Sequence, residues 1–192
     1  AGTTMSTNIF VVALVYDGGA SEMYLGNGAS GFTNTPVGTG NPYNFEALSF
    51  TPPAASVTLR FRSQSVSATA GSALLIDAIC MYEKSHANEV IVRNPSFETS
   101  SPQPPGGGGF GFINVTAGWA PLTDVMAGWT YWDGGYNSAV FGVGTNGNSY
   151  IAAVAEGQYA FIDNKSERWY AASSKQTQLS QTIEGLTSGD DY

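Results

Sequence analysis

Charged side chains, cysteine and histidine are scarce in this sequence of 192 residues. Only 11 % of the residues are charged, and the chain has one Cys and one His. A single Cys80 excludes a disulfide within the chain, and we expect it to lie buried in an apolar strand. A lone His86 gives little support to a catalytic triad or to a zinc site. Because no pair of carboxylates is marked for hydrolysis either, we expect a protein that is not an enzyme.

Long apolar runs and basic patches are also missing. No run approaches the ~18 consecutive apolar residues of a transmembrane helix, so we expect no membrane insertion. The net charge is −8, and acidic side chains outnumber basic ones in both halves of the chain. This charge distribution makes nucleic acid a poor partner.

The residues that are abundant predict an all-β fold. Gly, Ser, Thr and Asn are frequent and aromatic residues reach 12 %, a composition typical of extracellular β proteins. Strand-like stretches recur about every 8–15 residues, which is the spacing of a sandwich. Ile9–Tyr16 reads as a buried strand, and Ala73–Tyr82 reads as a long strand in the centre of a sheet.

Two stretches alternate clearly between apolar and polar residues. In the first, Val57, Leu59 and Phe61 face one way, while Thr58, Arg60 and Arg62 are expected to face water. In the second, Thr177, Leu179, Gln181 and Ile183 share one face of Gln176–Glu184. Each pattern predicts a strand with one face on the core.

Three motifs together resemble a known family. They are Val90–Glu98 (Val-Ile-Val-Arg-Asn-Pro-Ser-Phe-Glu), a following Gly-Trp (Gly118-Trp119 or Gly128-Trp129), and the later stretch Gln178–Gly189. They resemble the opening half of galactose-binding-like jelly-roll domains, a family that includes carbohydrate-binding modules and repeat domains of bacterial surface proteins. The resemblance implies an all-β jelly-roll sandwich.

The order of the halves is permuted relative to that family. Residues 1–83 resemble the second half of a jelly roll, residues 84–89 form a linker, and residues 90–192 resemble the first half. The halves can close on each other as a circular permutant, or each can complete the sandwich of a neighbouring chain. A tandem array cut at these positions explains the same order.

The permuted order leads to two hypotheses about function. The first is an extracellular or cell-surface structural repeat, a subunit of a filament or sheath that assembles head to tail by strand complementation. The alternative is a carbohydrate-binding module of a secreted enzyme or adhesin, with polysaccharide as its partner.

A structural calcium ion is implied by the family resemblance. In the family, the Glu of the opening motif and an Asp of the closing strand often lie near Ca²⁺, and the matching residues here are Glu98 and Asp77. Where the family often has a second Asp, this chain has Ala78. The other interpretation is that both carboxylates cap or pair locally at the edge of a sheet.

An aromatic cluster supplies the candidate sugar-binding residues. They are Trp132 and Tyr136, whose rings would stack on pyranoses, with Asp133 and Asn137 to bond hydroxyls. Alternation places Trp129 and Tyr131 together on the opposite face from Trp132, so we expect one of these faces to be core. Packing or interface contact is the competing role for the cluster.

Two sequons for N-glycosylation also occur. They begin at Asn114 and Asn164, and such triplets arise easily by chance in a sequence rich in Asn, Ser and Thr. In a glycosylated secreted protein they would mark surface loops.

Overall fold

The computed structural model describes residues 8–28, 31–34, 45–63, 73–86, 89–98, 110–114, 122–132, 140–145, 158–163 and 178–192. In these residues the protein is mostly β, and all the strand pairs are antiparallel. The helical residues of this part are few, namely the 3₁₀ turn η1 (Asp17–Gly19) and Gly28. The prediction of an all-β protein is therefore confirmed. The same residues contain no helix long and apolar enough to cross a membrane.

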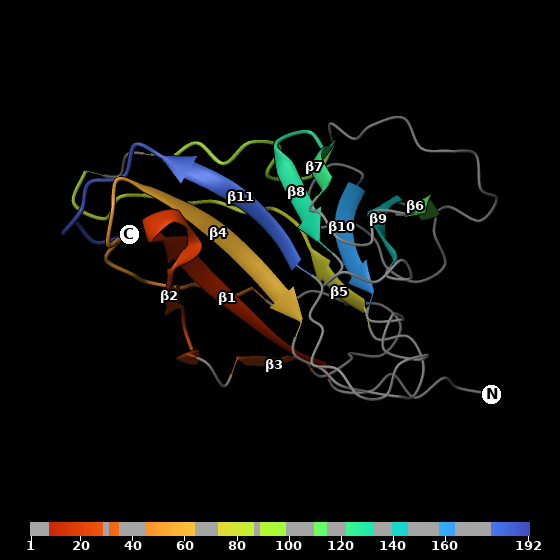
Figure 1. Ribbon diagram of the computed structural model, residues 1–192, viewed down its shortest axis with the longest axis horizontal. Helices are drawn as coiled ribbons and strands as arrows, with labels where there is room; N and C mark the ends of the chain where they lie inside the picture. Colours follow the sequence, from red (N-terminus) through yellow and green to blue (C-terminus); the bar gives the residue numbers. More distant parts are fainter. Residues whose placement is uncertain are drawn as a thin grey trace.

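The strands form two sheets, which Figure 1 shows at the two ends of the long axis. The larger sheet has the order β2-β1-β4-β11-β8-β7, with β3 also paired to β1. Its strands are β1 (Asn8–Tyr16), β2 (Ser21–Tyr24), β3 (Phe32–Asn34), β4 (Ser56–Ser63), β7 (Leu122–Met126), β8 (Trp129–Trp132) and β11 (Gln178–Glu184). The smaller sheet has the order β5-β10-β9-β6. Its strands are β5 (Ala73–Ile76), β6 (Phe110–Asn114), β9 (Val140–Thr145) and β10 (Gln158–Asp163).

Both sheets combine strands from the two halves of the chain. In the larger sheet, β4 pairs with β11 from Ser56↔Glu184 to Arg62↔Gln178. In the smaller sheet, β5 pairs with β10. The strands that precede residues 84–89 are thus hydrogen-bonded to strands that follow them, within one chain.

One face of the larger sheet carries the core, as the alternation of β4 and β11 predicts. Buried residues from four of its strands share this face: Val12, Leu14, Val57, Leu59, Trp129, Tyr131, Leu179 and Ile183. Complete burial of a large apolar side chain contributes about 1.5–3 kcal/mol. The expectation that one face of Trp129–Trp132 belongs to the core is confirmed, and it is the face of Trp129 and Tyr131, which are both fully buried.

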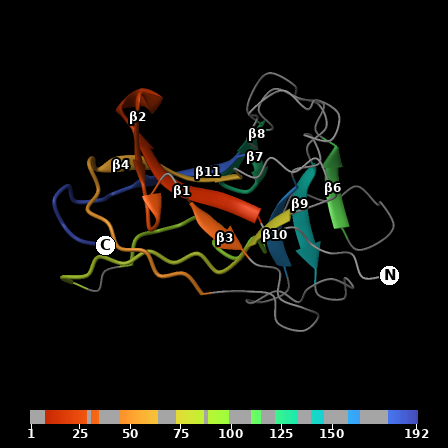
Figure 2. The ribbon, with the colours of Figure 1, turned by 90° about the horizontal axis from the view of Figure 1, so that it is seen from below.

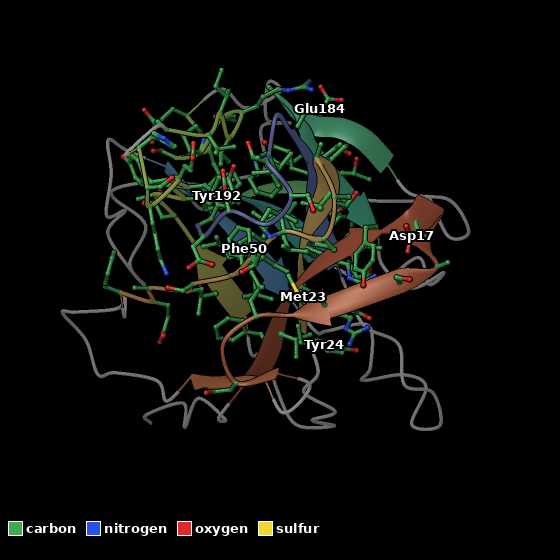
Figure 3. The ribbon with its side chains drawn as sticks, turned by 90° about the vertical axis from the view of Figure 1, so that its left-hand side faces the viewer. Asp17, Met23, Tyr24, Phe50, Glu184 and Tyr192 are labelled. Atoms are coloured by element: carbon green, nitrogen blue, oxygen red, sulfur yellow. The ribbon has the colours of Figure 1, made fainter. Side chains whose placement is uncertain are left out.

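Irregular extended segments, rather than regular strands, cover this core. Figure 2 shows residues 45–55 and 77–98 running below β1 and β11. Their inward residues include Met81, Val90, Val92 and Phe97. Phe50 and Tyr192 exchange two backbone hydrogen bonds of 3.1 and 2.9 Å, and the centres of their stacked rings lie 5.7 Å apart. Figure 3 labels these two residues next to each other. These segments are thus held together by a few isolated backbone bonds.

The prediction of a long central strand at Ala73–Tyr82 is wrong. The strand β5 ends at Ile76 and lies at the edge of its sheet. Ala78 has φ +52°, a left-handed conformation that interrupts an extended chain. Beyond it the segment belongs to the cover of the core, where Ile79 and Met81 face inward. Cys80 consequently faces outward and is exposed, so the expectation of a buried cysteine is also wrong.

Candidate functional site

The candidate site lies on the outer face of the larger sheet, opposite the core. Because side chains alternate along each strand, Arg60 lies on the other face from Leu59. The strand register places Tyr24, Ala13, Arg60 and Ser180 in one row across β2, β1, β4 and β11. Residues far apart in the sequence therefore meet as neighbours on this face.

A charged network occupies this face. Arg60 Nη2 forms an ion pair with Glu22 Oε1, and Arg62 Nη1 lies 3.9 Å from the same oxygen. Arg62 Nη2 donates a hydrogen bond of 3.2 Å to the hydroxyl oxygen of Tyr24, which itself donates to Glu22 Oε2 over 3.1 Å. The guanidinium of Arg62 also lies 5.8 Å from the centre of the Tyr24 ring. The carboxylate of Glu22 thus contacts the guanidinium groups of both Arg60 and Arg62.

The two arginines are far less exposed than their alternating pattern predicts. Their side chains are on the expected face but are only 17 % and 14 % accessible to solvent. Ala13 and Val11, their register partners on β1, are completely buried, which fits arginine stems lying along apolar surface. The Nε atoms of both arginines are buried and have no hydrogen-bond partner in the part of the chain that the structure describes.

An open groove of about 390 Å³ adjoins this network. Its lining includes the side chains of Thr58, Arg60, Gln178 and Ser180, together with the turn Asp17–Gly19. This turn depends on glycine, since Gly18 and Gly19 have φ of +65° and +96°. Figure 3 shows Asp17 and Tyr24 away from the stacked pair Phe50 and Tyr192. The groove offers hydroxyl, amide and guanidinium donors to a ligand.

The Asn94–Glu98 motif has a structural role in the described contacts. Phe97 is fully buried, and its ring centre lies 5.3 Å from that of Trp129. The carbonyl oxygen of Asn94 accepts two hydrogen bonds of 3.2 Å, from the backbone N–H of Phe97 and from Trp129 Nε1. Of the two Gly-Trp pairs in the sequence, Gly128-Trp129 is therefore the one seen to contact the motif; the other, residues 118–119, lies outside the described residues.

Gln181 fastens the same motif to β11. Its side chain is 3 % exposed, and its Oε1 accepts a hydrogen bond of 2.7 Å from the backbone N–H of Arg93. Its Nε2 donates one of 2.9 Å to the carbonyl oxygen of Arg93. The amide therefore pairs with Arg93 as a strand backbone would. Gly128 makes the close approach possible, because a Cβ there would lie 2.9 Å from Arg93 Cβ.

The two residues proposed for calcium lie on segments that are side by side. The backbone N–H of Ile79 donates to the carbonyl oxygen of Pro95 over 3.1 Å, which joins the segment after Asp77 to the one before Glu98. Asp77 Oδ1 accepts a hydrogen bond of 2.8 Å from the backbone N–H of Ala78. Within the described ranges, no three His, Cys, Asp or Glu side chains are grouped to hold a metal. Calcium stays a prediction.

The segments on either side of the linker predicted at residues 84–89 are joined to each other. Tyr82 and Glu89 form a β-bridge, and the backbone N–H of Val90 donates to the carbonyl oxygen of Met81 over 2.9 Å. Before the turn, the buried Glu83 contacts His86 Nδ1 at 2.5 Å. This hydrogen bond and the charge of Glu83 raise the pKa of His86 above its usual 6.5. The side chain of His86 is thus exposed to solvent but hydrogen-bonded to Glu83.

The structure places few of the candidate sugar-binding and glycosylation residues. Trp132 ends β8, and its Cα is paired with that of Gln178, which lines the groove. Asn114 ends β6. The others, Asp133, Tyr136, Asn137 and Asn164, lie outside the described residues. Whether Trp132 belongs to a sugar site thus stays a prediction.

Sequence reasoning missed most of the groove and of the charged network beside it. It noted the alternation of Thr58, Arg60 and Arg62, but Glu22 and Ser180 carried no signal, because their place depends on strand pairing. Across the whole chain, comparison with family models, with curated proteins and with solved structures found no match.

Proposed function

We propose that this chain is an extracellular structural repeat, a unit of a filament or sheath that assembles head to tail by strand complementation. Its fold is then a jelly-roll sandwich of the galactose-binding-like kind, in permuted order. The fold proposal draws support from the antiparallel pairing of the strands and from the contacts of the Asn94–Glu98 motif with Trp129.

The observation that carries the proposal is the pairing of β4 with β11. These strands come from opposite halves and match over seven residue pairs, from Ser56↔Glu184 to Arg62↔Gln178. The same seven pairs can form between β4 of one chain and β11 of the next. In such an exchange the pairs of β4 with β11 and of β5 with β10 break within one chain and re-form with the next. The net loss is then the bridge of Tyr82 with Glu89 and the backbone bond of Val90 to Met81.

Cysteine cross-linking across β4 and β11 tests this proposal. Thr58 and Thr182 are register partners on these strands. In a Cys80→Ser background, Thr58→Cys with Thr182→Cys should form a disulfide or accept a short bismaleimide. Head-to-tail exchange predicts a covalent ladder of multimers on a non-reducing gel, and light-scattering masses that stay high on dilution.

A matched pair within one half provides the control. Tyr16 and Ser21 are register partners on β1 and β2, both in the first half. Tyr16→Cys with Ser21→Cys should cross-link within a chain whether or not the halves exchange. If the pair across β4 and β11 also gives only monomers, and the light-scattering mass stays near 20 kDa, the filament proposal is wrong and the chain is a closed permutant.

One observation favours a second candidate function, carbohydrate binding. The groove on the outer face is lined by side chains that can bond sugar hydroxyls, namely Thr58, Gln178 and Ser180. Gln178 is also the register partner of Trp132, which brings the candidate aromatic residue to the same part of the sheet. A glycan array probed with the monomer tests this function, and loss of binding on Gln178→Ala would locate the site.

A further inference from the structure

The segments that cover the core, which Figure 2 shows below β1 and β11, carry exposed apolar side chains on their outward face. Ile91 is 80 % exposed and Tyr82 is 50 % exposed, although both are large hydrophobic residues. The bridge of Tyr82 with Glu89 sets a register in which Cys80, which is also exposed, comes opposite Ile91. Apolar groups from two neighbouring segments therefore lie together on the surface.

Two opposite charges flank Ile91 on its own segment. Residues 89–93 alternate between exposed and buried, so Glu89, Ile91 and Arg93 point outward. Glu89 and Arg93 are each two residues from Ile91, which is about 6.6 Å along an extended chain. Neither forms an ion pair with another residue of the described ranges. The exposed residues of this surface are called the outer strip below: Cys80, Tyr82, Glu89, Ile91 and Arg93.

The outer strip is complementary to itself in the reverse direction. When the strip is turned end for end, the acid lies where the base lay, and the apolar residue stays in the middle. A two-fold axis beside Ile91 therefore brings Glu89 of each copy opposite Arg93 of the other and sets Ile91 against Ile91. Opposite charges in facing positions are stabilising. An apolar partner, such as a lipid surface, would instead desolvate both charges without pairing them.

We propose that the outer strip is a two-fold contact with a second copy of this chain. Such a contact is isologous, which is the commonest arrangement in homo-oligomers. The other copy covers Ile91 and Tyr82, and two ion pairs of Glu89 with Arg93 fix the antiparallel order. Because the strip is only a few residues wide, the contact falls below the roughly 1,200 Å² of a stable interface, and the dimer is weak.

This contact is independent of the exchange of halves, because it uses neither β4 nor β11. It forms between two closed monomers as well as between units of two filaments. In the second case it joins neighbouring filaments sideways, since a head-to-tail filament repeats the outer strip along its length.

The single cysteine of the chain tests the contact without any substitution. The two-fold axis sets Cys80 opposite Cys80 of the other copy, so a short bismaleimide should convert the native protein into covalent dimers on a denaturing gel. The control is Cys80→Ser with Thr182→Cys, which moves the thiol to an exposed position on the face of β11 away from the core. The native protein should give about tenfold more dimer than this control, because a contact raises the effective concentration of its thiol partner.

Charge reversal checks the predicted pairing. Glu89→Arg and Arg93→Glu each place like charges opposite one another twice, so each should lower the dimer yield about tenfold. Mixing these two variants restores both ion pairs in a heterodimer, and the double variant restores them in a homodimer. Recovery of the yield on mixing also shows that each variant is folded, because an unfolded chain would present no strip.

The other results would overturn the proposal. A dimer yield of the native protein no higher than that of the Thr182→Cys control would exclude the contact. A high yield that persists in Arg93→Glu, or a loss that mixing does not reverse, would place Cys80 in a different interface. None of these results affects cross-linking between β4 and β11, so the filament proposal is tested separately.

Discussion

Replacing Gln181 should loosen the whole Asn94–Glu98 motif. The amide of this residue makes both hydrogen bonds to the backbone of Arg93, at 2.7 and 2.9 Å, from an almost fully buried position. Gln181→Met keeps the length and volume of the side chain and removes both bonds. At about 0.5–1.5 kcal/mol net for each hydrogen bond, the loss should be about 1–3 kcal/mol in the free energy of unfolding.

Gln181→Glu should make the stability depend on pH. A protonated carboxyl group can donate to the carbonyl oxygen of Arg93 and accept from its N–H, as the amide does, but an ionised one cannot donate. Burial and this hydrogen bond raise the pKa of the new carboxyl group in the folded state above its unfolded value of about 4.3. Its stabilising effect is therefore full below about pH 4 and is lost as the pH rises through the folded-state pKa.

Urea denaturation followed by tryptophan fluorescence measures both variants, since the buried Trp129 should report unfolding. At pH 7 we expect Gln181→Met to lower the free energy of unfolding by about 1–3 kcal/mol, and Gln181→Glu by more. At pH 4, Gln181→Glu should approach the unaltered protein. Thr182→Glu, at the exposed neighbouring position, is the control and should show little such dependence. Unaltered stability of Gln181→Met would refute the reasoning.

Two further predictions concern a glycine and the histidine. Gly128→Ala should destabilise the protein by about 1–3 kcal/mol more than Gly185→Ala. Both glycines have positive φ, but only a Cβ at position 128 would meet Arg93, at 2.9 Å. Equal losses in urea titrations would contradict this close approach of Gly128 to Arg93. Nuclear magnetic resonance titration of the single histidine should give His86 a pKa above 6.5 that falls back in Glu83→Gln. The stability contributed by the Glu83–His86 pair is full below about pH 6.5 and is lost as the pH rises through the raised pKa of His86. An unchanged titration in Glu83→Gln would exclude the hydrogen bond as the cause of the raised pKa.

Local patterns in the sequence predicted the faces of individual strands well. The alternation in β4 and β11 grouped Leu59, Leu179 and Ile183 on core faces, and that of β8 separated Trp129 and Tyr131 from Trp132 without deciding which face was core. These predictions work because the period of side-chain direction is a property of the strand alone.

Features that depend on backbone conformation or on pairing were not predictable in this way. Nothing in the apolar run after Ala73 indicates the positive φ of Ala78, which ends the strand and turns Cys80 outward. Likewise, Glu22 and Arg60 meet because β1 pairs with β2 on one side and with β4 on the other. The register of these strand pairs cannot be predicted from a single sequence.

The order of β1, β4 and β11 bears on how the protein would respond to a pulling force. Both outer strands are antiparallel to β4, so they run in the same direction, and Asn8 and Glu184 lie at opposite ends of the sheet. Tension applied at these two residues would slide the strands along one another. Because backbone bonds in an antiparallel sheet are perpendicular to the strands, the six pairs of β1 with β4 and the seven of β4 with β11 would share the load. Such a sheet would fail by shear rather than by opening one bond at a time, a geometry suited to a fibre under tension.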